Sequence, residues 1–333
     1  MVDTVLSGGW IIDGTRTPPY QADLCIQDGK IVAISPQWEG NCRTRVDVTG
    51  KIVSPGFIDI HTHSDTCPFS AVFPESKVAQ GITLEIVGNC RVSAVPILPS
   101  CQAEQTAYLR KISEIPVPEE AVRDASVQKY AAHVAQTGYP SHLGTLIGQG
   151  TLRAGIVGFQ DRPLTPSEME QMKFLLDDQL NQGALGLSLG LIYPPGSFSP
   201  TSELRELARV VQKHKKILAV HMRNEGPNIF QAVEEMLSIA EETGVHLHIS
   251  HLKLMGKAQW GQAPRLLERI EASRQRGAVV TCDQYPYTAT STILAALLPR
   301  RAYDGGSAAM LRRVSDPDTS LLRDIAEEME RRG

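Results

Sequence analysis

The stretch that decides the fold is Ser54-Pro55-Gly56-Phe57-Ile58-Asp59-Ile60-His61-Thr62-His63-Ser64-Asp65. Its apolar residues follow a Pro-Gly turn and give way to two histidines, a pattern that predicts a short buried strand with a polar end. Side chains alternate between the two faces of a strand, so His61 and His63 are expected to point the same way. Two imidazoles on one face are either half of a metal site or a pair of polar surface groups, and the rest of the chain must decide between these.

Composition limits the class of protein. The chain has 333 residues, of which 42% are hydrophobic, so it can bury a large core as one or two domains. A formal net charge of -4 gives no reason to expect nucleic acid or a membrane as partner. The N-terminus lacks the pattern of a signal peptide, and no apolar run approaches the roughly 20 residues that span a bilayer. The six cysteines lie far apart, which predicts a cytoplasmic protein with free thiols.

Turn residues divide the chain near residue 54. Over residues 1–54, short apolar runs alternate with Gly, Pro and Asp turns, which predicts a small β-rich domain. Over residues 55–333, strand patterns alternate with helix patterns. One helix is predicted to begin at the capping box of Thr165 and to end at Gly183. After the opening strand, six further strands are expected, over residues 83–88, 143–147, 184–189, 217–220, 246–250 and 279–282.

The alternation of strands and helices predicts an α/β fold with a parallel sheet, and seven strand positions indicate a (β/α)8 barrel, also called a TIM barrel. The eighth strand is not evident before Gly333. Residues 290–333 are charged and helical in pattern, and we expect them to form part of a helical insertion. The barrel is therefore expected to lack its last strand in this chain and to leave two unpaired edges.

Ligand-type side chains follow several of the expected strands. His61 and His63 follow the first strand, Cys90 the second, His221 the fifth and His251 the sixth. The carboxyl ends of barrel strands meet on one face, where such enzymes carry their active sites. Imidazole and thiolate favour zinc, which activates water when three protein ligands leave a position open. The pattern therefore predicts a zinc site.

Each of these residues has a simpler explanation when taken alone. A lone cysteine is more often a buried apolar group, and a lone histidine is often a hydrogen-bonded core residue. The sixth strand also carries His246 and His248 on the face opposite His251, so alternation by itself does not choose among them. We favour His251 because it stands at the strand end and Lys253 has the same parity.

Several segments resemble one group of enzymes. The segment Pro-Gly-Phe-Ile-Asp-x-His-Thr-His after a small β-rich unit resembles the amidohydrolase superfamily, whose fold is a metal-dependent-hydrolase (β/α)8 barrel. Five more segments, in chain order, are similar to the N-acyl-D-amino-acid deacylases (D-aminoacylases): Gly88-Asn89-Cys90, Tyr193-Pro194-Pro195, Val220-His221-Met222-Arg223-Asn224-Glu225-Gly226, Ile249-Ser250-His251-Leu252-Lys253 and Asp283-Gln284-Tyr285-Pro286-Tyr287. The resemblance implies hydrolysis of the amide bond of N-acyl-D-amino acids to a carboxylate and a free D-amino acid.

The resemblance also implies a set of metal ligands. One tightly bound zinc would be held by Cys90, His221 and His251, and a second, weak or optional metal by His61 and His63. The cysteine is informative because many amidohydrolases use a carboxylated lysine to bridge two metals. The implied chemistry is polarisation of the amide carbonyl and of a bound water, with a carboxylate that moves the proton to the leaving amine.

Four residues match the positions of substrate contacts in the family. These are Lys253, Tyr193, Tyr285 and Ser291, and the implied partner is a small-molecule N-acyl amino acid. A lysine or tyrosine beside a carboxylate makes charge-assisted hydrogen bonds that fix its orientation. Tyr285 and Ser291 are equally well explained as residues that shape the mouth of the barrel. The sequence carries no signal for an oligomeric state.

The sequence departs from the family at three points. The family's general-base aspartate ends the eighth strand, so it is expected beyond Gly333 and no catalytic base is assigned here, although Asp65 or Asp283 would be a local substitute. Arg91 stands where relatives carry glycine, and a bulky cation there affects either the neighbouring thiolate or the backbone turn. Gln149 stands where relatives have histidine after glycine.

Other functions stay open at this point. A cyclic-amide hydrolase of the hydantoinase or dihydroorotase type would carry a metal-bridging lysine, and Cys90 argues against it. A catalytically inactive zinc-binding relic accounts for the missing base, Arg91 and Gln149, whereas a fragment of an active enzyme accounts for the retained ligands. We expect the chain as given to bind about one zinc and to show little or no deacylase activity.

Overall fold

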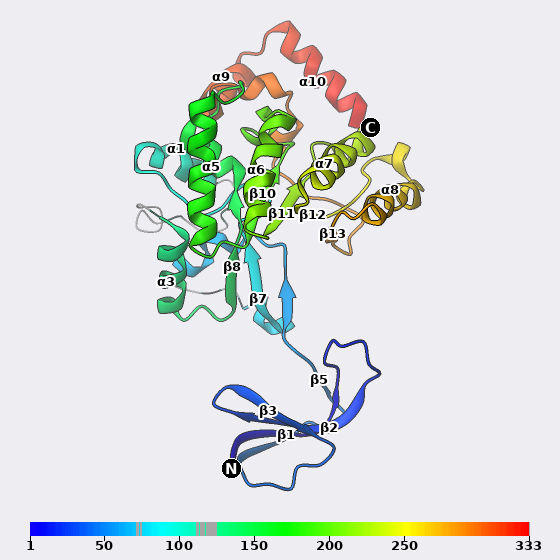
Figure 1. Cartoon of the computed structure of the whole chain (residues 1–333). Helices are drawn as coiled ribbons and strands as arrows, with labels where there is room; N and C mark the ends of the chain where they lie inside the picture. Colours follow the sequence, from blue (N-terminus) through cyan, green and yellow to red (C-terminus); the bar gives the residue numbers. More distant parts are fainter. Residues whose placement is uncertain (71–72, 74, 111–112, 114–116, 118–124, 333) are drawn as a thin grey trace. The chain divides into compact units, whose positions relative to one another are not determined.

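The computed structural model describes all residues except 71–72, 74, 111–112, 114–116, 118–124 and 333 (Figure 1). Contacts divide the chain into two compact units, Met1–Phe57 and Ile58–Gly333. The boundary lies close to the one that the turn pattern predicts. No helix in the described part of the chain has the length and apolarity needed to cross a membrane.

The first unit is a five-stranded sheet built around its first strand. The strand β1 pairs with β2 in antiparallel fashion and with β4 and β5 in parallel, and β3 continues the sheet beyond β2. The strands are β1 (Val2–Ile11), β2 (Tyr20–Gln27), β3 (Lys30–Ser35), β4 (Cys42–Asp47) and β5 (Ile52–Val53). Residues 1–57 contain strands and turns but no helix.

The second unit alternates strands with helices. Its strands form two sheets, with the orders β6-β7-β8 and β9-β10-β11-β12-β13. The strands are β6 (Phe57–Asp59), β7 (Ile82–Val87), β8 (His142–Thr145), β9 (Ile147–Gly148), β10 (Gly186–Gly190), β11 (Ile217–His221), β12 (His246–Ile249) and β13 (Val280–Cys282). Only Leu146 separates β8 from β9, so the chain passes between the two sheets within the third predicted strand position. Strands occur at all seven predicted positions, and closure by an eighth strand stays a prediction.

Helices follow the strands in regular order. In Figure 1, α5, α6, α7 and α8 stand side by side in the same sequence as the strands β10 to β13. The described helices are α1 (Gln102–Leu109), α3 (Val127–Thr137), α4 (Gln149–Ile156), α5 (Pro166–Asn181), α6 (Thr201–Lys213), α7 (Ile229–Thr243), α8 (Ala263–Gln275), α9 (Gly306–Ser315) and α10 (Thr319–Arg332). The last two lie in the region that the sequence marks as helical, and its role as an insertion stays a prediction.

The helix α5 shows how the sequence sets these elements. Thr165 and Glu168 form the predicted capping box, in which each side chain bonds the other residue's backbone N–H. Met172, Leu176 and Leu180 recur at helical spacing and are no more than 3% exposed. Burial of this apolar stripe against the sheet stabilises the helix far more than its intrinsic propensity does.

The opening strand differs from its prediction. It was expected to be buried, but Ile58 is 59% exposed and Ile60 is 40% exposed. The reason is topological, because β6 is the end strand of its sheet. The strand β13 likewise ends the other sheet, and Val279 just before it is 54% exposed. The first and the last strands of the series are thus both end strands of their sheets.

Candidate metal centre

A tight turn after β7 places Cys90 at the strand ends. Gly88 has a φ of 78°, and a Cβ there would lie 2.1 Å from the carbonyl oxygen of Leu146, so only glycine fits. Cys90 and Arg91 also have positive φ, at 50° and 81°. The side-chain amide of Asn89 donates to the carbonyl of Ile86 at 2.9 Å and holds the turn. Glycine adopts this left-handed backbone most readily, so a side chain as large as that of Arg91 is unusual here.

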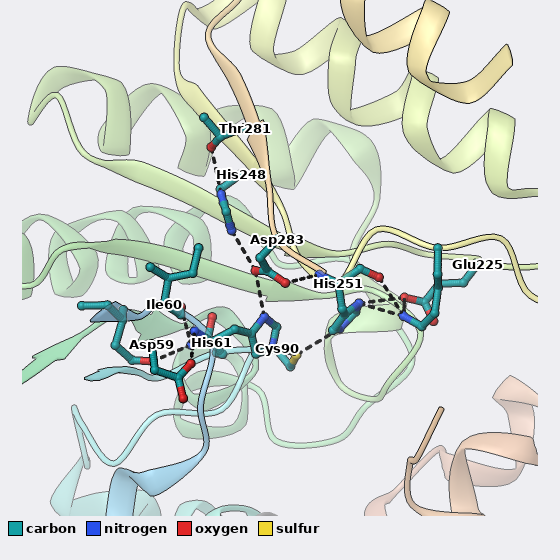
Figure 2. A network of polar contacts seen from close by, with 12 residues as sticks. Asp59, Ile60, His61, Cys90, Glu225, His248, His251, Thr281 and Asp283 are labelled. Carbon is teal, nitrogen blue, oxygen red and sulfur yellow. Dashed lines mark hydrogen bonds and ion pairs between the residues drawn. The ribbon is translucent and has the colours of Figure 1, made fainter. Parts of the chain in front are cut away.

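The thiol of Cys90 lies among imidazoles from distant parts of the chain. Its Sγ is 3.2 Å from Nε2 of His61 and 3.5 Å from Nε2 of His251 (Figure 2). One ligand atom from each of these three residues falls within 4.8 Å of the other two. Cys90 is 7% exposed, so the group is shielded from bulk water.

A second group shares His251 with the first. Oε1 of Glu225 lies 3.0 Å from Nδ1 of His251 and 3.8 Å from Nε2 of His221. The rings of His221 and His251 meet edge to face, with centroids 4.3 Å apart. Among the described residues, neither ring nitrogen of the buried His221 has a hydrogen-bond partner, and neither has Nδ1 of His63. Buried nitrogens without partners are costly, and a metal ion would satisfy them.

The five predicted ligands thus occupy one region, in which two overlapping groups of ligand atoms share His251. The first group contains His61, Cys90 and His251, the second contains His221, Glu225 and His251, and His221 also interacts with the Cys90 thiol. His63 lies beside His61, with ring centroids 5.8 Å apart, and contacts the Cys90 thiol. The division into a tight and a weak metal position therefore stays a prediction.

The choice among the three histidines of the sixth strand is clear from the geometry. His251 brings its ring to Cys90, and its backbone has a φ of 37° just past the strand end. His248 and His246 turn instead to the hydroxyl of Thr281, at 2.8 and 2.9 Å. Of these histidines, the structure places only His251 in the group of ligands.

Asp283 connects several of these residues, a role that was not predicted from the sequence. Its Oδ2 is 3.1 Å from Nδ1 of His61 and 2.8 Å from Nε2 of His248, and its Oδ1 accepts the backbone N–H of His251 at 2.6 Å (Figure 2). Metal-binding histidines commonly donate their second ring N–H to a carboxylate, which fixes the tautomer. The sequence feature that could have indicated this role is an aspartate directly after the last strand, at the same edge as the ligands.

Glu225 is a second residue whose role was not predicted from the sequence. Nζ of Lys253 donates to its Oε1 at 2.6 Å and also lies 2.9 Å from Nδ1 of His251. The carboxylate is therefore shared between a predicted substrate contact and a predicted ligand. Its signal in the sequence was a carboxylate four residues after His221, within a motif noted only for its resemblance to the family.

Charge interactions shift the pKa values of the group strongly. Burial raises the pKa of the Cys90 thiol, but the surrounding imidazoles outweigh it and lower this pKa well below its ordinary value. Burial lowers the pKa of His61, yet bonds to Asp283 and Cys90 raise it to about 10. A thiolate and an imidazolium are thus favoured side by side, and a zinc ion would replace the proton between them.

The two carboxylates of the group are held in their charged forms. Burial raises the pKa of Glu225, but contacts with His251, His221 and Lys253 lower it to about 2. Burial also raises the pKa of Asp283, but its bonds to His248 and His61 move it well below the ordinary range. Each charge is already satisfied by several donors.

Three of the four predicted substrate contacts line cavities. Lys253 and Tyr285 line a cavity of about 650 Å³, whereas Tyr193 lines another of about 250 Å³. The Tyr193 hydroxyl lies 2.7 Å from that of Thr292. Ser291 is exposed and lines neither of these two cavities.

Gln149, at which the sequence departs from the family pattern, belongs to a buried polar network. Gln149 is fully buried, and its side-chain nitrogen lies 2.7 Å from the Ser199 hydroxyl and 3.0 Å from a carboxylate oxygen of Glu203. The same carboxylate forms an ion pair with the buried Arg153. Gln149 therefore has a clear structural role at this position.

Known proteins resemble this chain in sequence and in structure. No family model matches the chain. The D-aminoacylase of Alcaligenes xylosoxydans xylosoxydans is 36% identical over 292 residues, which are 88% of this chain and 59% of that protein. The chain thus spans about three fifths of the length of the curated relatives it matches.

Solved structures agree with the sequence matches. An N-acyl-D-glutamate deacylase from Bordetella bronchiseptica, complexed with zinc and a phosphonate mimic of the tetrahedral intermediate, has a TM-score of 0.79 and 37% identity, and the match covers 90% of this chain and 61% of that one. A D-aminoacylase with a binuclear metal centre, described as activated by one metal and attenuated by a second, has a TM-score of 0.79 and 36% identity, covering 90% and 62%. An L-hydantoinase from Arthrobacter aurescens, at 15% identity and a TM-score of 0.57, shows the fold alone. Over about nine tenths of its length, this chain is thus similar to the D-aminoacylases and N-acyl-D-amino-acid deacylases.

Proposed function

We propose that the protein is a zinc-dependent hydrolase of the amide bond of N-acyl-D-amino acids, which it converts to a carboxylate and a free D-amino acid. The observation that carries the proposal is the pair of ligand groups around Cys90 and His251, at the strand ends of a chain 36% identical to a D-aminoacylase. A thiolate among imidazoles is a donor set that favours zinc.

The metal positions follow from the same residues. We assign a tightly bound zinc to Cys90, His221 and His251, and a second, weaker metal to His61 and His63. Support comes from the unpartnered nitrogens of His221 and from the binuclear centre of the related D-aminoacylase. Zinc at such a position supplies a Lewis acid for the amide carbonyl and lowers the pKa of a bound water.

The surrounding residues position these ligands. Nδ1–H of His61 donates to Asp283, and Nδ1–H of His251 donates to Glu225, so both Nε2 atoms face the Cys90 thiolate. This assignment of tautomers follows from the hydrogen-bond partners. Asp283 and Glu225 therefore fix the direction in which the imidazoles present their lone pairs.

Substrate orientation is assigned to the residues of the larger cavity. Lys253 is anchored by Glu225, and its Nζ lies 5.5 Å from the centre of the Tyr285 ring. An ammonium and a phenol in this position bind the carboxylate of an N-acyl amino acid through charge-assisted hydrogen bonds. Tyr193 packs against another of the candidate ligands, with its ring 4.8 Å from that of His221.

The carboxylates described so far are poor general bases. The low pKa values of Glu225 and Asp283 mean that they hold protons weakly and already serve as acceptors. Burial raises the pKa of Asp65 to about 6, but this residue is 1% exposed and accepts the backbone N–H of Gly88 at 2.9 Å. We therefore assign the proton-accepting carboxylate to none of these three residues.

The six cysteines in the chain are all free, and we propose a reducing cytoplasmic compartment on that ground.

The test is an assay of the zinc-loaded protein with pairs of substrate enantiomers. N-acetyl-D-amino acids should be hydrolysed to acetate and the free D-amino acid, while the L-enantiomers should stay intact. Hydantoin and dihydrouracil are included because a hydantoinase shares the fold. Opening of these rings, with no hydrolysis of the linear D-amides, would overturn the proposal in favour of a cyclic-amide hydrolase.

A further inference from the structure

Arg91 places a buried guanidinium beside the metal centre. The residue directly follows Cys90 and is 4% exposed. One of its terminal nitrogens donates to the carbonyl oxygen of Cys90 at 2.9 Å. The guanidinium carbon lies 3.7 Å from the centre of the Tyr193 ring and 5.5 Å from that of Tyr108. The cation is therefore held between aromatic rings.

Neighbouring glycines make room for this side chain. A Cβ at Gly190 would lie 2.7 Å from Cδ of Arg91, and one at Gly150 would lie 3.1 Å from its Cγ. Both glycines belong to other elements, at the end of β10 and in α4. The local backbone thus accommodates the long side chain of Arg91.

The charge of Arg91 has no carboxylate partner among the described residues. Its Nε has no hydrogen-bond partner there either. The contrast is Arg153, a fully buried arginine that forms an ion pair with Glu203. A buried charge without a counter-charge is costly, and contacts with aromatic rings offset only part of that cost. An anion bound beside the guanidinium of Arg91 would balance this charge.

The space next to Arg91 is a cavity of about 250 Å³. Arg91, Tyr193, Ser307 and Met310 are among its lining residues, and none of the lining residues in the described chain carries a carboxylate. Tyr193 connects this cavity with the centre because its ring packs against that of His221. The cavity is separate from the larger one, which Lys253 lines.

We propose that Arg91 binds a carboxylate of the substrate in this cavity, in addition to the carboxylate assigned to Lys253. This inference rests on the proposed function and names its substrate class: N-acyl-D-amino acids that carry a second carboxylate. A planar guanidinium pairs with a carboxylate through two parallel hydrogen bonds, and the small cavity suits a short acidic chain. The second carboxylate belongs either to the amino acid's side chain or to the acyl group.

Binding of unreactive analogues to the zinc-loaded protein tests the proposal by calorimetry. The first pair is N-methanesulfonyl-D-glutamate and N-methanesulfonyl-D-glutamine, which have nearly the same shape but differ by one charge. The second pair is N-(2-carboxyethylsulfonyl)-D-leucine and its carbamoyl counterpart. In one of the two pairs, the acid should bind at least about tenfold more tightly than the amide. The pair that shows the difference identifies the source of the carboxylate.

Two sets of variants assign the effect to Arg91. Arg91→Met should reduce the preference for the acid over the amide to about one, and Arg91→Lys should retain part of the preference. Met310→Glu places a carboxylate in the same cavity, so it should abolish the preference, whereas Met310→Gln should keep it. If Arg91→Met does not fold, the two Met310 variants alone test the proposal.

The proposal is overturned if acid and amide bind equally in both pairs, or if the preference survives in Arg91→Met. Hydrolysis of N-acetyl-D-leucine is followed separately. Charge-dependent binding together with opening of hydantoin or dihydrouracil, and no cleavage of N-acetyl-D-leucine, contradicts the proposed function alone, whereas hydrolysis without charge-dependent binding contradicts the role of Arg91 alone.

Discussion

Asp283 accepts a hydrogen bond from Nδ1 of His61 at 3.1 Å, although 222 residues of sequence separate them. The bond leaves Nε2 of His61 facing Sγ of Cys90 at 3.2 Å. The same carboxylate also holds His248 and the backbone of His251. The end of the last strand in the series therefore orients ligands that come from the first strand and the sixth.

Replacement of Asp283 by asparagine should weaken metal binding. The amide removes the charge that holds the ring of His61, and loss of such an outer partner typically costs about 10- to 100-fold in metal affinity. Competition with a coloured zinc chelator measures the affinity directly. Asp316→Asn, at an exposed position, is the matched control and should leave the affinity unchanged. Equal affinities for the two variants would contradict the positioning role of Asp283.

Replacement of Cys90 by alanine should remove most of the bound zinc. The thiolate is the one sulfur ligand of the proposed set, and the imidazoles lower its pKa well below the usual value. Metal analysis of the purified protein measures the zinc content. Cys282→Ala, which removes an exposed thiol, should retain the zinc of the parent chain. Full zinc retention by Cys90→Ala would sink the ligand assignment.

The buried pair of Arg153 and Glu203 should be important for stability. Their side chains are 0% and 3% exposed, and Glu203 also accepts hydrogen bonds from Gln149 and Ser199. Glu203→Gln leaves the guanidinium uncompensated, which should lower the free energy of unfolding by roughly 3–5 kcal/mol. Urea denaturation measures this change. Glu242→Gln, at an exposed pair, should cost less than about 1 kcal/mol.

The capping box of α5 should contribute a pH-dependent part of the stability. The hydrogen bond from Arg162, and then the backbone N–H of Thr165, lower the pKa of Glu168 to about 2 from an ordinary value of 4.5. A lowered pKa stabilises the folded state above pH 4.5, and this contribution is lost as the pH falls towards 2. Glu168→Gln should therefore cost roughly 0.5–1 kcal/mol at pH 7, a difference that shrinks in acid. Glu170→Gln serves as control, and an equal effect of both variants at all pH values would argue against the cap.

Residues 1–333 alone should bind zinc but hydrolyse N-acyl-D-amino acids slowly. The reason is that Glu225 and Asp283 are already engaged as acceptors, and Asp65 lies buried away from solvent. Zinc content and release of the D-amino acid are measured on the same sample. Fast hydrolysis that disappears in Asp65→Asn would show that Asp65 serves as the base after all.

The positions of the ligands were predictable because they depend on local patterns. Each predicted ligand stands at a strand end, and a strand end is visible as an apolar run followed by a polar or glycine turn. The parallel alternation of strands and helices then brings those ends to one edge. For this reason Cys90, His61 and His251 were found together in the structure, as the sequence indicated.

The burial of the opening strand was not predictable in the same way. Ile58 and Ile60 have the composition of a core strand, yet they are exposed because β6 is an edge of its sheet. Apolar composition shows that a segment needs cover but does not show whether a neighbouring strand is present. That depends on the order of strands in the sheet.

The sequence by itself determined the alternation of strands and helices, the strand-end positions of the candidate metal-binding side chains and the resemblance to the D-aminoacylases. The tertiary structure decided which residues hold those side chains in place. Asp283 reaches His251 because β12 and β13 pair in parallel with Ile249 opposite Cys282. It reaches His61 only because the sheets bring the first and last strands of the series to one place. Hydrogen bonds of this kind depend on strand register and on distances of about 3 Å, which no local pattern of residues encodes.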